Sequence, residues 1–225
     1  MRVALEEQLN IAQATLQEES SLVLRMLRAV LNALAAADAE LAADVIAFDD
    51  QVDEKYLRVE HLVEELVALQ APTAGDMRRV LAISRVNLHL ERMADYCVTI
   101  AKTTQLTAGM GSDDNLLGWL EEMGSRAEEM IAVALNAFAS LDTVAAESLI
   151  DLDEMIDRTN RRAVDRVVEL AADPARREWS VRMLLVSRCL ERIGDHAVDV
   201  GEQTAYLVTG EFREFTDASH PQAGD

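Results

Sequence analysis

The sequence is poor in residues that interrupt helices and in those that build disulfide scaffolds or membrane spans. Of its 225 residues only 3 are proline and 9 are glycine, and aromatic residues make up 4%. Although 50% of the residues are hydrophobic, no uncharged apolar run approaches the length of about 18 that indicates a membrane-spanning helix. Cys97 and Cys189 lie far apart, which argues against a disulfide scaffold and for a reducing cytosol. We therefore expect a cytoplasmic protein, and its composition favours long helices.

Positive charge is also scarce. The chain has 21 basic and 41 acidic side chains, and its formal net charge is −20. Such a surface repels phosphate backbones and anionic lipids, so we expect no nucleic-acid partner and no direct binding to a membrane. Divalent cations or a basic partner surface are the natural counterparts of this charge.

Apolar residues recur at helical spacing through six long stretches. The predicted helices cover residues 3–37, 38–70, 77–107, 113–141, 142–172 and 176–208. Their short connections predict antiparallel neighbours. A glycine-rich break near 109–112 divides the chain into a first unit, 1–110, and a second unit, 111–210, and a flexible tail is expected over 211–225.

The second half of the chain repeats the first. Asp49 recurs as Asp153 at an offset of 104, and Glu91 recurs as Glu191 at an offset of 100. The change of offset indicates that one hairpin of the second copy is four residues shorter, since 104 − 100 = 4. An internal repeat of three helices predicts an all-α fold of two homologous antiparallel three-helix bundles in tandem.

Each half carries two pairs of carboxylates, and the members of a pair are four residues apart. This spacing stacks like charges on one helix face, where they repel each other. A solvated acidic face is the alternative interpretation, but Glu91 and Glu191 fall within apolar seams, where a buried carboxylate needs a partner or a metal. Oxygen ligands suit Mg, Mn and iron, and they can also hold zinc. The candidate metal ligands are Asp49, Asp53, Glu91 and Asp95 in the first half and Asp153, Asp157, Glu191 and Asp195 in the second.

Other chemistry finds less support in the sequence. His61 and His89 have no counterpart in the repeat and are interpreted as ordinary surface or core residues, whereas His196, beside Asp195, is a candidate for a further ligand. The chain has no Glu-x-x-His pair, no Gly-x-x-x-x-Gly-Lys loop and no Gly-x-Ser-x-Gly elbow. Carboxylates around two metal ions can activate water, so a metal-dependent phosphatase or hydrolase is the alternative to a non-enzymatic protein.

Two stretches resemble a known family. Residues 190–197, Leu-Glu-Arg-Ile-Gly-Asp-His-Ala, and the later Tyr-Leu-Val-Thr-Gly-Glu at 206–211 are similar to the signature of the PhoU family of phosphate transport accessory proteins. Residues 70–78, Gln-Ala-Pro-Thr-Ala-Gly-Asp-Met-Arg, are similar to a turn of the same family. The resemblance extends from the first helix to Glu211 and includes the duplication.

The resemblance implies two three-helix bundles, each with a multinuclear metal cluster on its acidic pairs, usually of iron or zinc. It also implies a non-enzymatic repressor of the phosphate-starvation response. Such a protein links the ATPase subunit of the phosphate ABC transporter to a membrane sensor histidine kinase. Helices of this length also favour a homodimer.

The first copy of the signature departs from the family pattern. Met93-Ala94 stands in place of Ile-Gly, and Tyr96-Cys97 stands in place of His-Ala. All the carboxylates are retained, so we expect both metal sites to exist and the second to be the better one.

Overall fold

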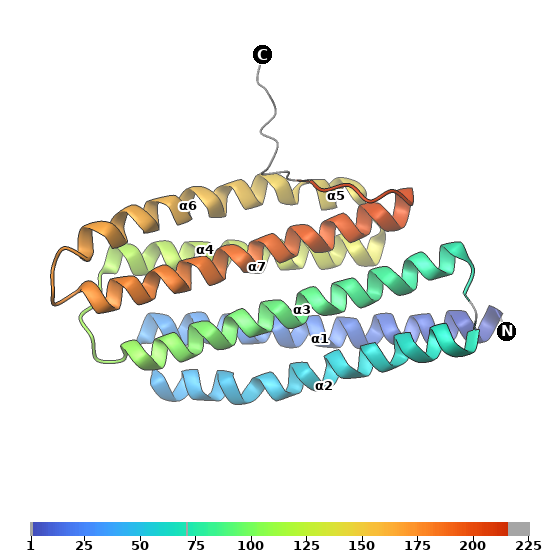
Figure 1. Ribbon diagram of the computed structural model, residues 1–225, viewed down its shortest axis with the longest axis horizontal. Coiled ribbons are helices and arrows are strands. Elements are labelled where there is room, and N and C mark those ends of the chain that lie inside the picture. Colours follow the sequence, from blue (N-terminus) through green and yellow to red (C-terminus); the bar gives the residue numbers. More distant parts are fainter. Residues whose placement is uncertain (1, 71, 216–225) are drawn as a thin grey trace, which may run out of the picture.

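The computed structural model describes residues 2–70 and 72–215 and contains no strand within them. Short connections join its helices (Figure 1). The helices are α1 (Arg2–Ala36), α2 (Ala39–Gln70), α3 (Ala74–Thr107), α4 (Asp114–Ser140), α5 (Thr143–Glu147), α6 (Leu149–Leu170) and α7 (Arg177–Thr209). The all-α prediction is confirmed. Within the described residues, no helix is both long and apolar enough to cross a membrane.

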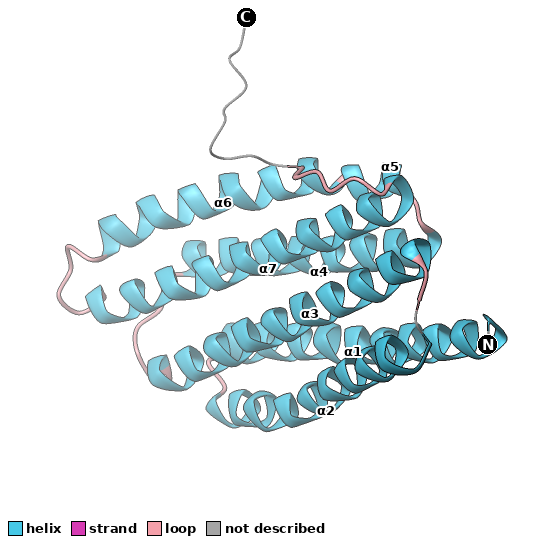
Figure 2. Cartoon of the chain, turned by 45° about the vertical axis from the view of Figure 1, so that its right-hand side comes forward, coloured by secondary structure: helices cyan, strands magenta, loops and turns pink. Residues whose placement is uncertain are grey.

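The helices form two units that lie side by side. In both views α1, α2 and α3 form one unit, and α4, α6 and α7 form the other with the short α5 (Figures 1 and 2). The units meet chiefly where α3 runs antiparallel to α7, with a smaller contact between α1 and α4. Buried apolar side chains form one core cluster that includes both units. The prediction of two tandem antiparallel bundles is therefore confirmed.

The repeat is visible in the way the helices end. Ala37, after α1, and Leu141, after α4, both adopt left-handed backbone conformations, with φ of 50° and 57°. The next residue is an aspartate in each case. Asp38 accepts a hydrogen bond from the Leu41 N–H at 3.0 Å, and Asp142 accepts one from Ala145 at 3.0 Å. These side chains satisfy backbone donors that a helix N-terminus leaves free, so the two units share one turn chemistry.

The second unit differs from the prediction at one point. A single helix was expected over 142–172, but the structure divides it into α5 and α6 at Ser148. This break lies against Gly201 of α7, where an added Cβ would stand 3.2 Å from the Ala146 carbonyl oxygen and 2.7 Å from Leu149 Cδ1. We attribute the break to this close approach of backbones. In the first unit the matching residue is Ala101, and α2 runs without a break.

The start of the predicted flexible tail makes defined contacts. The Phe215 N–H donates a hydrogen bond to Glu202 at 2.7 Å, and Arg213 donates one to Glu147 of α5 at 2.7 Å. The Phe215 ring packs against the core. Residues 216–225 of the predicted tail, and residue 71 of the predicted turn, lie outside the described residues.

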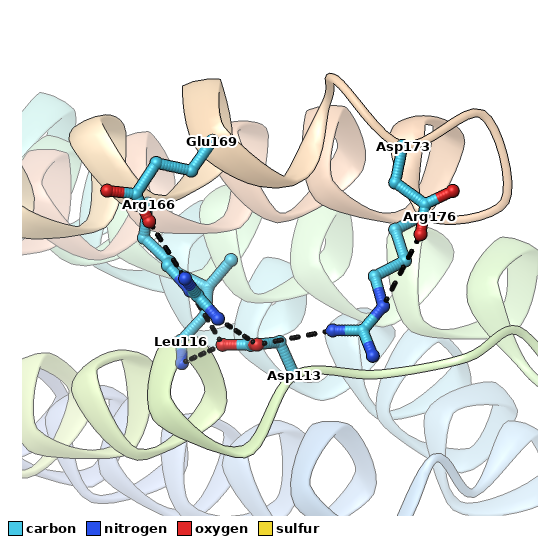
Figure 3. Close-up of polar contacts among 6 residues, drawn as sticks. All are labelled: Asp113, Leu116, Arg166, Glu169, Asp173 and Arg176. Atoms are coloured by element: carbon cyan, nitrogen blue, oxygen red, sulfur yellow. Dashed lines mark hydrogen bonds and ion pairs between the residues drawn. The ribbon is translucent and has the colours of Figure 1, made fainter.

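One buried aspartate ties the start of the second unit to its last two helices (Figure 3). Asp113 is 7% exposed and caps α4 by accepting a hydrogen bond from Leu116 N–H at 3.1 Å. Its carboxylate also lies 2.7 Å from Arg166 of α6 and 3.5 Å from Arg176, which precedes α7. The hydrogen bond from Arg166 is the main reason why the pKa of Asp113 lies below its usual value.

Replacing this aspartate should destabilise the second unit. Asp113→Ala removes the cap and one of the two carboxylate partners of Arg166, so we expect a loss of about 2 kcal/mol in unfolding free energy. Because the pKa of Asp113 is lowered in the folded chain, its ionised carboxylate stabilises the fold at pH values above the ordinary aspartate pKa. This contribution disappears as the pH falls through the folded pKa. The difference between wild type and Asp113→Asn should therefore shrink on acidification.

Denaturant unfolding at neutral and at acidic pH measures this difference. Asp38→Asn, at the exposed cap of α2, is the matched control and should cost about 1 kcal/mol or less. An Asp113→Asn variant as stable as wild type at neutral pH would contradict the assigned role.

Candidate metal centre

The first unit brings the two predicted acidic pairs together. Asp49 and Asp53 lie on α2, and Glu91 and Asp95 lie on the adjacent helix α3. Burial raises the pKa of Asp49 to about 6, and the negative charges of Asp53, Asp95 and Glu91 add to the shift. The four carboxylates are therefore close enough to repel one another, as the sequence predicted.

The second unit repeats this arrangement on α6 and α7. Burial raises the pKa of Asp153 to about 7, and the charges of Asp195, Asp157 and Glu191 raise it further. Burial is also the main cause of the raised pKa of Glu191. Because a nearby cation would reverse these shifts, both groups have the electrostatics of a cation site.

Two carboxylate oxygens in these groups are buried without a hydrogen bond. They are Glu91 Oε2 in the first unit and Asp153 Oδ1 in the second. Asp153 Oδ1 packs against α7 where a Cβ on Gly194 would stand 3.4 Å away. At the matching position of α3, Ala94 takes the place of this glycine. Glu91 Oε2 has only an ion pair with Arg92 Nε at 3.5 Å. Hard oxygen donors without a hydrogen bond are suitable ligands for a metal ion, so the residues present fit the predicted metal.

Arginines on the same helices compete for these carboxylates. Arg92 donates a hydrogen bond to Asp95 at 3.1 Å, and Arg192 makes the matching bond to Asp195 at 3.1 Å. Arg188 is paired with Glu191. A metal ion would have to draw the carboxylates away from these arginines. The four carboxylates of each unit are neighbours, but among the described residues neither group has three ligand atoms that all lie within 4.8 Å of one another, so the side chains would have to move to surround one ion.

A fifth carboxylate, which the sequence analysis missed, lies beside the first group. Glu19 of α1 is 0% exposed, and neither of its carboxylate oxygens has a hydrogen-bond partner. Burial raises its pKa to about 9, with further contributions from the charges of Glu91 and Glu60. The matching residue of the second unit is Met123, which is also buried. The signal available in the sequence was a lone acidic residue on the apolar face of the first helix.

The structure also brings His89 of α3 and His196 of α7 together. Their Nδ1 atoms are 3.1 Å apart, and Asp199 Oδ2 lies 3.4 Å from the first and 3.2 Å from the second. In the part of the chain that the structure describes, this is the one group of three candidate ligand atoms that all lie within 4.8 Å of one another. The interpretation of His89 as an ordinary residue missed this contact, because it spans the two halves of the repeat.

The structure has two three-helix bundles in tandem, and each bundle carries an acidic group on matching helices. These features define a class of duplicated all-α proteins. A family model described as the PhoU domain matches residues 16–104 and 120–204. The chain therefore belongs to the PhoU family.

Named relatives and solved structures agree with this assignment. The chain is 30% identical to a phosphate-specific transport system accessory protein PhoU homolog of Zymomonas mobilis, over 92% of this chain and 87% of that protein. A homolog of the same name from Pseudomonas aeruginosa is 30% identical over 88% of this chain and 81% of that protein. The crystal structure of PhoU from Pseudomonas aeruginosa superposes with a TM-score of 0.87 at 29% identity, covering 92% of this chain and 99% of that one. PhoU from Streptococcus pneumoniae superposes with a TM-score of 0.85 at 28% identity, covering 93% and 99%.

Glu19 should make the stability of the metal-free protein dependent on pH. The folded chain keeps this proton up to about pH 9, whereas an unfolded glutamate releases it near pH 4.5. Unfolding thus releases a proton in this window, and the unfolding free energy falls as the pH rises. Glu19→Gln removes this loss, so the variant should gain about 4 kcal/mol relative to wild type between about pH 5 and pH 8.

Denaturant unfolding of metal-free protein at the two pH values tests this prediction. Glu7→Gln, on the exposed face of the same helix, is the control and should change little. A Glu19→Gln variant that follows the wild-type pH dependence would show that this carboxyl is not the buried acid described above.

Proposed function

We propose that the protein is a non-enzymatic accessory regulator of phosphate uptake that represses the phosphate-starvation response when phosphate is plentiful. The observation that carries the proposal is a pair of PhoU domains that together match residues 16–104 and 120–204. Relatives that match most of the chain carry the name of phosphate-specific transport accessory protein. The partners we propose are the ATPase subunit of the phosphate ABC transporter and a phosphate-sensing histidine kinase, both reached from the cytoplasm.

We propose further that each unit binds a metal cluster through its four carboxylates, with iron or zinc favoured and Mn or Mg as alternatives. The repeat of raised pKa values in Asp49 and Asp153, and the buried oxygens of Glu91 and Asp153 without hydrogen bonds, support this proposal. A bound cluster would neutralise charges that otherwise repel one another across α2 and α3 or across α6 and α7. The role of the metal in this proposal is to hold each pair of helices rigid for a partner, in a homodimer or a larger complex.

The arrangement of arginine side chains at the acidic groups favours a regulatory role over a phosphatase role. Arg92, Arg161, Arg188 and Arg192 lie there, and each pairs with a carboxylate of its own helix. Arginines held in this way are not positioned to bind a phosphate ester, which a phosphatase needs at its metal ions.

The metal should depend on the predicted ligands. A Glu191→Gln/Asp195→Asn variant keeps the shape of the second group but removes two of its charges, so it should lose the metal of that unit. Elemental analysis of purified protein should show about half the metal of the wild type. The matched double variant Arg188→Gln/Arg192→Gln keeps the carboxylates and frees them from their arginines, so it should keep or gain metal. Equal metal in wild type and the acidic variant would refute the ligand assignment.

Deletion tests the regulatory role directly. Cells without this protein should express their phosphate-starvation genes even in phosphate-rich medium, because the link from transporter to kinase is lost. Reporter expression and phosphate uptake measure the effect, and a plasmid copy of the wild type should restore repression. Intact repression in a strain with no second copy of the protein would refute the regulatory role. Turnover of a phosphomonoester by metal-loaded protein, abolished in Glu191→Gln/Asp195→Asn, would favour the phosphatase instead.

A further inference from the structure

We propose that His89, His196 and Asp199 form a binding site for one zinc-like divalent cation between α3 and α7, separate from the acidic groups. The site goes beyond the proposed function, because it joins the two units of the chain and uses nitrogen ligands. His89 comes from the first unit, and the other two residues come from the second. An ion bound here would be a crosslink between the units.

The spacing of the three ligand atoms is the spacing that a tetrahedral ion requires. The distances are 3.1 Å between the two Nδ1 atoms, 3.4 Å from His89 Nδ1 to Asp199 Oδ2 and 3.2 Å from His196 Nδ1 to the same oxygen. Zinc bonds to nitrogen and oxygen of about 2.0 to 2.1 Å place tetrahedral ligands about 3.3 to 3.4 Å apart. The separations of the three atoms are therefore close to those of three ligands around one ion.

The three atoms do not satisfy one another well without a cation. A neutral imidazole carries a proton on only one nitrogen, and two protonated Nδ1 atoms cannot face each other at 3.1 Å. One Nδ1 must therefore act as an acceptor beside a carboxylate oxygen that is an acceptor as well. A metal ion binds the lone pairs of all three atoms at once.

The environment of the triangle is that of a partly enclosed site with an open position. The side chains of His89 and His196 are 17% and 19% exposed, whereas that of Asp199 is 40% exposed. The Tyr96 ring stacks on His196 with its centroid 5.8 Å away and an interplanar angle of 25°. The stacked ring limits the orientations of the imidazole, and the exposed side leaves room for water as the fourth ligand.

The duplicated sequence has these three ligands at only one of the two equivalent places on the α3–α7 contact. The offset of 100 that relates α3 to α7 pairs His89 with Cys189, His196 with Tyr96 and Asp199 with Thr99. The matching place on the other side of the α3–α7 contact thus lacks both histidines and the carboxylate. We therefore expect one such ion in each chain, whereas the acidic groups come in pairs.

Cobalt(II) spectroscopy distinguishes this site from the acidic groups. Metal-free protein without a histidine tag is titrated with Co²⁺, followed by displacement with Zn²⁺. A tetrahedral site with two imidazoles should give intense visible absorption that saturates at one equivalent, whereas sites with only oxygen ligands and water give weak octahedral bands. Zinc X-ray absorption at one equivalent should then show scattering from two imidazole rings.

Variants identify the residues that give rise to the cobalt absorption and the zinc scattering. His89→Gln should abolish the intense bands and the imidazole scattering. His61→Gln, at an exposed histidine of α2, and Asp49→Asn/Asp53→Asn, in the first acidic group, should leave both unchanged. Wild type that gives only weak octahedral bands, or His89→Gln that keeps the intense ones, would overturn the proposal. If the His89→Gln chain does not fold, the wild-type spectrum and the number of scattering rings decide the question alone. A protein without regulatory function could still show the site, so this result is independent of the proposed function.

Discussion

The packing of α3 against α7 is the constraint on which the rest of the structure depends. Each of these helices is covered by the other helices of its own unit on one side and by its counterpart on the other. Both must therefore be apolar on two faces, and Glu91 and Glu191 lie beside buried surface. Burial raises the pKa of both carboxyls, so their negative charges are costly and a bound cation would offset that cost.

Contacts within each unit explain why the two units are not equivalent although they derive from one repeat. At Gly201 the backbone of α5 approaches α7 closely, and the matching residue Ala101 leaves α2 continuous. Glu19 lies in the core of the first unit where the second has Met123. A duplicated fold thus keeps its helices and caps while its buried polar residues diverge, because burial tolerates a carboxyl only where it is neutral or has a partner.

The charges of this protein act at long range and at short range in different ways. The surface is acidic overall, with a net charge of −20, and such a field repels anions and attracts cations from a distance. At close range, arginines such as Arg92 and Arg192 pair with the carboxylates of their own helices. A metal ion at either acidic group therefore competes with local arginines but gains from the field of the whole chain.

Much of this protein follows from local sequence pattern. Helix positions, the duplication and the acidic pairs can all be predicted, because apolar spacing and carboxylates at i and i+4 depend only on helix geometry. The family resemblance likewise rests on contiguous residues such as those at 190–197. Asp38 and Asp142 are recognisable as helix caps for the same reason.

Contacts between residues distant in sequence were decided only by the tertiary structure. His89 meets His196 across 107 residues, and Asp113 meets Arg166 across 53, so no local period reports either contact. Glu19 lies near Glu91 because α1 and α3 pack in one unit, and burial then raises its pKa. The physical reason is the same in each case. Helix periodicity determines which face of a helix is buried, but the side chains that meet there depend on how the helices pack.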